Sequence, residues 1–217
     1  MRTRADGTRL KFWYNTNALK FYDKEKIALR LEATINSPKE YKVFRTKEGE
    51  PRDAPKSWQH LRKGVADLHR RAEVADAANK RLAESLATVA APQTLGALLQ
   101  PLGRPVVKDG RRVARALNPL NGGDGDLLQA LAQGEYLLNG FRNRDLRLSL
   151  CGPCGDAKER RRQAAQVTRR LALLRAHGLI LWIQKTHRYQ LTASGRRVVT
   201  ALLTATAADA EKLANAA

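Results

Sequence analysis

The segment from residue 157 to residue 178 most constrains what this chain can fold into, because it combines one apolar stripe with an unusual density of arginine. Val167, Leu171 and Leu174 fall at i, i+4 and i+7, so they share one face of a helix. Gly178 follows, and its freedom to adopt the left-handed conformation suits it to end that helix. Basic side chains crowd the same segment: Lys158, Arg160, Arg161, Arg162, Arg169 and Arg170. A basic helix held down by one apolar stripe is suited to lie against a polyanion.

The flanking residues predict the rest of a small domain. A helix opens at Asp126, Phe141 enters the core, and Asn143 caps a helix over residues 144–150 with Asp145 in its first turn. After the basic helix, residues 179–183 and 188–192 predict two strands, joined by a tip at 184–187. A final helix is expected from Ala193 to about Leu213.

This order of elements resembles the winged-helix domains of bacterial regulators, in which a leucine and then Gly-Leu-Ile precede the wing. The matching residues are Leu174, Gly178, Leu179 and Ile180. The Gly-rich loop at 151–156 departs from the family, because it is longer than a tight turn. The resemblance implies a helix in the major groove of DNA and a wing on the adjacent backbone or minor groove.

The candidate DNA contacts follow from that arrangement. Most are arginines and lysines, which position a protein on phosphates without reading sequence, whereas Gln163 and Gln166 suit a base edge. The alternative to DNA contact is that these residues form a basic face exposed only to solvent. The segment from Arg142 to Arg175 contains ten basic and three acidic residues. This excess of positive charge is larger than solubility requires, so it favours DNA contact. The candidates are Arg142, Arg144, Lys158, Arg161, Arg162, Gln163, Gln166, Arg169, Arg170, Lys185, His187 and Arg188.

The formal net charge of +19 and the pI near 10.6 also indicate a polyanionic partner, either nucleic acid or an anionic membrane surface. The sequence has no apolar run near the roughly 18 residues of a spanning helix, and its first residues do not read as a secretory signal. We therefore expect a cytoplasmic protein without a membrane partner. Its cysteines, Cys151 and Cys154, agree with a reducing compartment.

Residues 8–36 alternate apolar and polar side chains with a period of two, which predicts a three-stranded antiparallel meander with one apolar and one charged face. Turns are expected at 15–17 and 23–26. The apolar face, including Leu29, Leu31 and Ala33 on the third strand, needs a cover. Downstream helices supply it, or a protein partner does.

The segment Ala18–Glu25 followed by Leu29–Glu32 resembles a hairpin of plasmid and phage rolling-circle replication initiators. That resemblance implies a metal-dependent nuclease, or a remnant of one, with Tyr22, Glu25 and Glu32 as candidate catalytic or metal-holding residues. The His-x-His pair of those enzymes is missing. The opposing interpretation, which we favour, is that Glu32 is a solvated strand residue paired across the sheet with Lys20 or Arg30.

The middle of the chain predicts helices and one hairpin. Ser57 can cap a long helix from Trp58 to about Ala90, which could cover the meander or form a dimer seam. Thr94 caps a short helix at 95–99, and Asp109-Gly110 predicts a tight hairpin turn. Residues 118–125 read as a linker, so we place a domain boundary there, with domains at 1–117 and 118–217.

Cys151 and Cys154 raise the question of a metal. A zinc site would need His177 and His187 as further ligands, and their places at the helix end and the wing make convergence doubtful. We expect no cofactor. The sequence thus predicts an α+β fold, an N-terminal antiparallel meander with a long helix and then a C-terminal winged helix-turn-helix. The expected function is duplex DNA binding in transcription regulation or mobile-element replication, with an enzyme as the alternative.

Overall fold

The computed structural model describes residues 2–4, 7–24, 28–87, 94–120 and 122–207. Helices and antiparallel sheets are both present, and the predicted N-terminal meander is confirmed. The chain separates into two compact units, which we take one at a time. The first unit contains the residues up to Leu82 together with Gly134–Asn139 and Gln184–Thr186, and the second contains the remainder.

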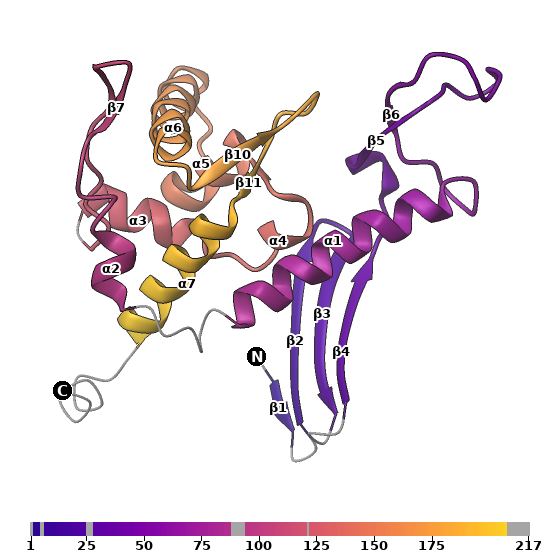
Figure 1. The fold of residues 1–217 in the computed structure, drawn as a ribbon, viewed down its shortest axis with the longest axis horizontal. Helices are drawn as coiled ribbons and strands as arrows, with labels where there is room; N and C mark the ends of the chain where they lie inside the picture. The colour runs from indigo at the N-terminus through magenta and orange to yellow at the C-terminus, as the bar shows by residue number, and fades with distance from the viewer. Residues whose placement is uncertain (1, 5–6, 25–27, 88–93, 121, 208–217) are drawn as a thin grey trace. The chain divides into compact units, whose positions relative to one another are not determined.

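The first unit is built on a four-stranded antiparallel sheet in the order β1-β2-β3-β4 (Figure 1). Its strands are β1 (Arg2–Arg4), β2 (Gly7–Tyr14), β3 (Asn17–Lys24) and β4 (Ala28–Thr34). Asn15 turns the chain between β2 and β3 with a φ of 52°. Asp23 and Lys24, expected in the second turn, belong to β3, and Glu25 lies outside the described residues.

The sheet has one apolar face that is only partly covered. Leu19 on this face is fully buried, whereas Leu29, which we expected on the covered face, keeps 66% of its surface exposed. Gly134 packs directly on the Phe12 ring, so closely that an added Cβ would clash with it. The segment at 134–139, which forms α4 (Tyr136–Asn139), therefore closes on the sheet.

Asn17, expected in the first turn, lies at the start of β3 and is buried, where it fixes the end of the meander. Its side-chain oxygen accepts hydrogen bonds from the backbone N–H groups of Asn36 and Ser37, each at 2.9 Å. A buried polar group needs such partners, because leaving it unpaired costs about 1–3 kcal/mol. Asn17 thus fixes where the chain leaves the sheet, ahead of the short helix η1 (Pro38–Glu40).

The long helix predicted from Trp58 is wrong at its start. Residues Ser57–His60 form strand β6, which pairs antiparallel with β5 (Lys42–Arg45), and Trp58 packs on Phe44 with ring centroids 5.7 Å apart. Helix α1 (Leu68–Ala87) begins after Asp67. The buried Asp67 carboxylate accepts from Arg62 at 2.8 Å and lies 3.3 Å from the Arg45 guanidinium, which ties the hairpin to the helix start.

Helix α1 contributes Ala78 and Leu82 to the core of the first unit. From the same helix, the Arg81 guanidinium donates to the carbonyl oxygens of Leu137 and Leu138 at 2.7 and 2.9 Å. Those carbonyls belong to α4, so a charged group satisfies backbone acceptors that α4 leaves open. Arg81 therefore fastens the segment that covers the sheet.

The second unit contains the remaining elements. Its core gathers apolar side chains from α3, α5, α6, the strands and α7, with Phe141, Leu146, Leu171 and Leu174 almost fully buried. No helix in the described ranges is long and apolar enough to cross a membrane. The elements are α2 (Leu95–Leu99), β7 (Val106–Lys108), β8 (Arg111–Ala114), α3 (Gly122–Ala130), β9 (Phe141–Arg142), α5 (Asn143–Cys151), α6 (Ala157–Ala176), β10 (Ile180–Ile183), β11 (Arg188–Leu191) and α7 (Ala193–Ala207).

Two local predictions in this unit are confirmed and one needs correction. Thr94 caps α2 by accepting from the Ala97 N–H, and Asp109 and Gly110 form the β7–β8 turn with φ values of 49° and 74°. The linker expected at 118–125 is wrong in its second half, because α3 begins at Gly122. The two compact units divide after Leu82, and residues 134–139 and 184–186 belong to the first of them.

Candidate nucleic-acid interface

Helix α6 forms as its sequence predicts. Asp156 caps it by accepting from the N–H groups of Lys158 and Glu159 at 3.1 and 3.0 Å. Val167, Leu171 and Leu174 are at most 1% exposed, which confirms the apolar stripe. Gly178 has a φ of 70°, so the predicted left-handed end of the helix is also confirmed.

Helix α5 begins one residue earlier than predicted. Arg142 occupies the cap position, and its N–H donates to the Asp145 carboxylate at 2.8 Å. Asn143 is not the cap. Its side-chain amide donates to the Ala164 carbonyl at 3.0 Å and to the Thr168 hydroxyl at 2.9 Å, both on α6. Asn143 therefore fixes the two helices against each other.

The face of α6 opposite its apolar stripe carries exposed cations. This face carries Lys158, Arg161, Arg162 and Arg169. The small side chains of Ala165 and Ala172 lie on the same face. Arg162 pairs with Glu159 at 3.1 Å. Within the described residues, no carboxylate pairs with Lys158, Arg161 or Arg169. We call Lys158, Arg161, Arg162 and Arg169 the α6 cation face.

Two of the three remaining α6 candidates, Gln163 and Arg170, turn toward the protein. Gln163 is half-buried, accepts from Arg147 at 3.2 Å and donates to Glu159 at 3.4 Å, so its amide is engaged within the unit. Arg170 is half-buried against α3, where its guanidinium lies 3.1 Å from the Cβ position of Gly123. Gln166 is exposed at the edge of the cation face and keeps its amide available.

The two strands predicted after the basic helix are present as the β10–β11 hairpin, and β9 pairs with β11 to complete a three-stranded sheet in the order β10-β11-β9. At its tip, Lys185 and His187 are exposed, and the Lys185 carbonyl accepts from the Lys42 ammonium at 2.8 Å. Lys42 is thus a further cation at this tip.

Arg188 corrects the expectation for the wing. Only 2% of its surface is exposed, and its guanidinium donates to the Gly140 carbonyl at 3.5 Å. It cannot reach DNA, because the β11 register turns it inward opposite Arg142. Arg142 is half-buried on β9, whereas Arg144 is exposed, 3.5 Å from Asp145.

The β7–β8 hairpin was predicted, but its basic residues were not among the candidate DNA contacts. Lys108, Arg111 and Arg112 are exposed on it, and β8 packs beside α6 (Figure 1). Just after it, Arg115 forms two bonds of 2.7 Å with Asp124, and its carbonyl contacts the His177 ring at 2.8 Å. Basic residues on both sides of the Asp109-Gly110 turn were the available signal.

Asp124 holds this hairpin and is sensitive to pH. The hydrogen bonds from Arg115 hold the pKa of the Asp124 carboxyl below its usual value, and the Asn118 N–H adds to the effect against the opposing burial. A folded-state pKa below the unfolded one means that the carboxylate stabilises the fold above about pH 4, and that this contribution is lost as the pH falls further.

We expect Asp124→Asn to lower the free energy of unfolding by about 1–3 kcal/mol at pH 7, because it removes charge-assisted hydrogen bonds at a buried site. Asp126→Asn, an exposed change on the same helix, is the matched control and should have little effect. Chemical denaturation at pH 7, 5 and 3 measures both. A deficit for Asp124→Asn that persists undiminished at pH 3 contradicts the assignment.

Of the candidate catalytic residues, the structure describes Tyr22 and Glu32, whereas Glu25 lies outside the described residues. Glu32 pairs with Lys20 at 3.7 Å and with Arg30 at 2.5 Å, which confirms the cross-sheet interpretation. Among the described residues, no three His, Cys, Asp or Glu side chains gather as metal ligands. Cys151 and Cys154 are free thiols, and the Cys154 thiol donates to the Asp156 carbonyl at 3.6 Å.

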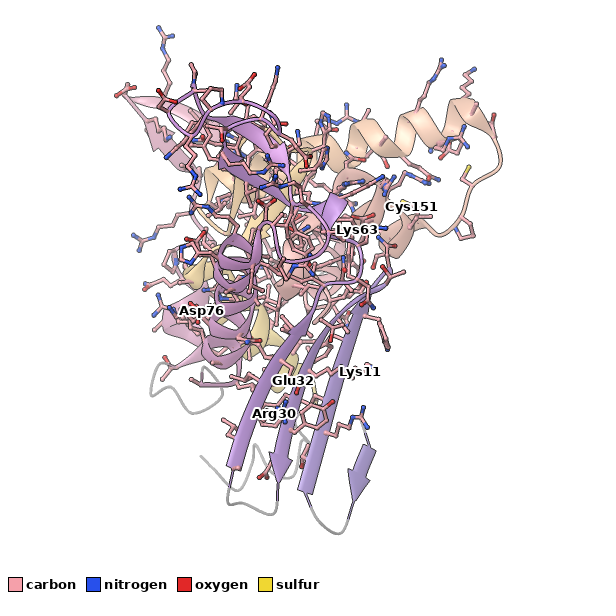
Figure 2. The ribbon with its side chains drawn as sticks, turned by 90° about the vertical axis from the view of Figure 1, so that its right-hand side faces the viewer. Lys11, Arg30, Glu32, Lys63, Asp76 and Cys151 are labelled. Atoms are coloured by element: carbon pink, nitrogen blue, oxygen red, sulfur yellow. The ribbon has the colours of Figure 1, made fainter. Side chains whose placement is uncertain are left out.

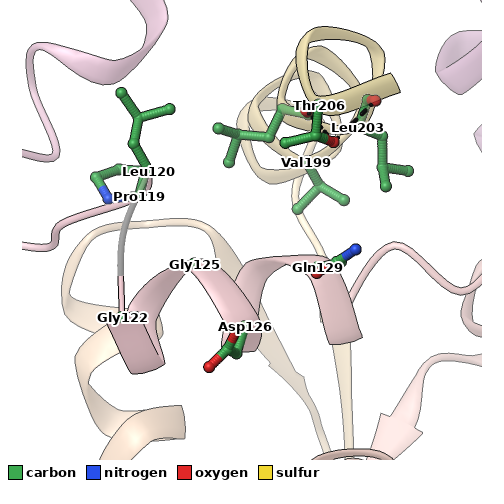
Figure 3. Close-up of a pocket in the computed structure, with 10 residues that line it drawn as sticks. Pro119, Leu120, Gly122, Gly125, Asp126, Gln129, Val199, Leu203 and Thr206 are labelled. Atoms are coloured by element: carbon green, nitrogen blue, oxygen red, sulfur yellow. Dashed lines mark hydrogen bonds between the residues drawn. The ribbon is translucent and has the colours of Figure 1, made fainter. Parts of the chain in front are cut away.

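A cavity of about 290 Å³ lies between α3 and α7 (Figure 3). Leu120, Val199 and Leu203 give it an apolar wall, and Asp126 and Gln129 add two polar groups from α3. None of the cations described above lines it, so it takes no part in the basic surface. No protein-family model, no curated protein and no solved structure matches the chain.

Proposed function

We propose that the second unit is a winged helix-turn-helix that binds duplex DNA, with α6 entering the major groove. The order of elements supports this: α3, β9, α5 and α6 are followed by the β10–β11 hairpin, and β9 joins that hairpin in one sheet. In a winged helix, the helix in the position of α6 reads the groove and the hairpin lies along the backbone.

The observation that carries the proposal is the α6 cation face. Lys158, Arg161 and Arg169 are held on a rigid helix, are exposed, and have no carboxylate partner within the described ranges. Phosphates would neutralise them and release counterions, which is the main source of affinity in such complexes. Ala165 and Ala172 leave room for the helix to approach the groove closely.

The hairpins on the two flanks of α6 extend the basic surface. β8 and β10 both pack beside α6, and their hairpins carry Lys108, Arg111 and Arg112 on one and Lys185 and His187 on the other. Since arginine and lysine mainly position a protein on phosphates, sequence readout falls to Gln166 at the edge of the face. Such a protein acts in transcription regulation or in mobile-element replication, in the cytoplasm of a bacterium.

The test is a titration of the whole chain against a short fluorescent duplex at several salt concentrations. With each of the four members of the cation face on one phosphate, the logarithm of the association constant should fall against the logarithm of salt with a slope of about −3.6 or steeper. A slope shallower than about −1, which means at most one phosphate contact, overturns the proposal.

A further inference from the structure

The register of β2, β3 and β4 places a second basic surface on the meander, far in sequence from α6. Residues paired directly across strands share a face of a sheet. Three such rows lie on the face opposite the apolar one, and we call them the polar face of the meander. The rows are Arg9–Tyr22–Arg30, Lys11–Lys20–Glu32 and Trp13–Ala18–Thr34.

The charges on this face are unbalanced. Arg9, Lys11, Lys20 and Arg30 share it with one carboxylate, Glu32, which already pairs with Lys20 and Arg30. The pKa of the Lys11 ammonium is lowered, first by partial desolvation on the sheet and then by repulsion from Lys20 and Arg9. Like charges placed directly opposite one another on a sheet destabilise it, so an anionic ligand would relieve a standing repulsion.

Two aromatic rings are set among these cations (Figure 2 labels Lys11, Arg30 and Glu32). Trp13 is 50% exposed, and the Lys11 ammonium lies 3.8 Å from its ring centroid. The Tyr22 ring is half-buried, with the Arg9 guanidinium 5.1 Å from its centroid. The Lys11–Lys20 row lies between the rows of Trp13 and Tyr22, so ammonium groups alternate with ring faces along the sheet.

We propose that the polar face of the meander binds single-stranded nucleic acid. Bases stack on Trp13 and Tyr22, and phosphates bind Lys11, Lys20 and Arg9. Sequence-tolerant single-strand sites combine a basic track with aromatic platforms in this way. A duplex fits the face poorly, because its bases are already stacked on one another. The inference uses residues of the first unit only, so it does not depend on duplex binding by α6.

The test compares two tryptophans of similar exposure, Trp13 and Trp182. Fluorescein-labelled oligo(dT) and oligo(U) are titrated with the whole chain, and Trp13→Ala should weaken binding about five- to a hundredfold through the loss of one stacked base. Trp13→Phe should retain most of the affinity. Trp182→Ala, which removes a side chain 46% exposed on β10, is the matched control and should change little. Equal affinity for Trp13→Ala and Trp182→Ala overturns the proposal.

A second readout places the ligand on the ring directly. The chain has three tryptophans, so Trp58→Phe/Trp182→Phe leaves Trp13 as the only indole. Oligo(dT) should quench its emission, and Lys11→Ala should make the salt slope shallower by about 0.7. Stronger binding of oligo(U) than oligo(dT) would identify RNA as the ligand. Quenching by phosphatidylserine vesicles but not by either oligonucleotide would assign the face to membranes and overturn the proposal.

Discussion

Replacing Lys158, Arg161 and Arg169 together with alanine should reduce affinity for duplex DNA on the order of a hundredfold at 0.15 M salt. Each lost phosphate contact removes about 0.9 from the salt slope, so the slope should become shallower by about 2.7, and that exponent sets the size of the loss. Alanine is the best helix former, so α6 should remain intact. Fluorescence anisotropy across a salt series measures the slope and the affinity in one experiment.

The control removes the same charge elsewhere. Arg52, Lys56 and Lys63 are exposed in the first unit, and their triple alanine variant should keep the wild-type slope to within about one contact. A third variant, with Lys108, Arg111 and Arg112 changed to alanine, should lose less than the α6 variant because hairpin contacts lie at the edge of the surface. Equal losses for the α6 variant and the control would show that net charge alone drives binding.

Gly195→Ala should lower the free energy of unfolding by about 3 kcal/mol, near the upper end of the usual range for overpacking. A Cβ at this position would lie 2.0 Å from the Leu179 carbonyl oxygen and 3.1 Å from the Leu191 side chain. That oxygen cannot easily retreat, because it also accepts the Thr192 N–H at 3.0 Å. The first turn of α7 would have to leave the strand that follows α6. Differential scanning calorimetry should show a fall in Tm of about 10 °C.

Gly155→Ala is the matched glycine control. Nothing lies within 4 Å of its Cβ position and its φ is not in the left-handed region, so it should be neutral or stabilise by up to about 1 kcal/mol. If Gly195→Ala and Gly155→Ala have the same Tm, the close packing of α7 on Leu179 is wrong.

Local patterns in the sequence were enough to predict the parts of the fold that short-range physics decides. The apolar stripe of α6, its glycine end and the Asp109-Gly110 turn depend on spacing and backbone preference within a few residues. The alternation of residues 8–36 likewise predicted the meander. In each case the signal and the structure occupy the same stretch of chain.

The errors arise where distant residues decide the outcome. Ser57–His60 reads as a helix start, yet it pairs with Lys42–Arg45, a strand that the sequence prediction left unassigned. Arg188 looks like a wing contact until its strand pairs with β9 and turns it toward Gly140. Gln163 suits a base edge in isolation, but Arg147 on α5 engages its amide. Pairing partners of this kind cannot be found from periodicity alone.

Gln163's engagement has a consequence for how the protein would occupy a chromosome. With that amide held by Arg147, the outward side of α6 offers guanidinium and ammonium groups and, at its rim, Gln166. A surface that contacts mainly DNA phosphates discriminates weakly among the millions of overlapping positions in a genome. Under the proposed function, the number of copies bound to a DNA molecule would scale with the length of that DNA. A short replicon would therefore hold proportionally fewer copies than a chromosome, and each copy would slide between positions.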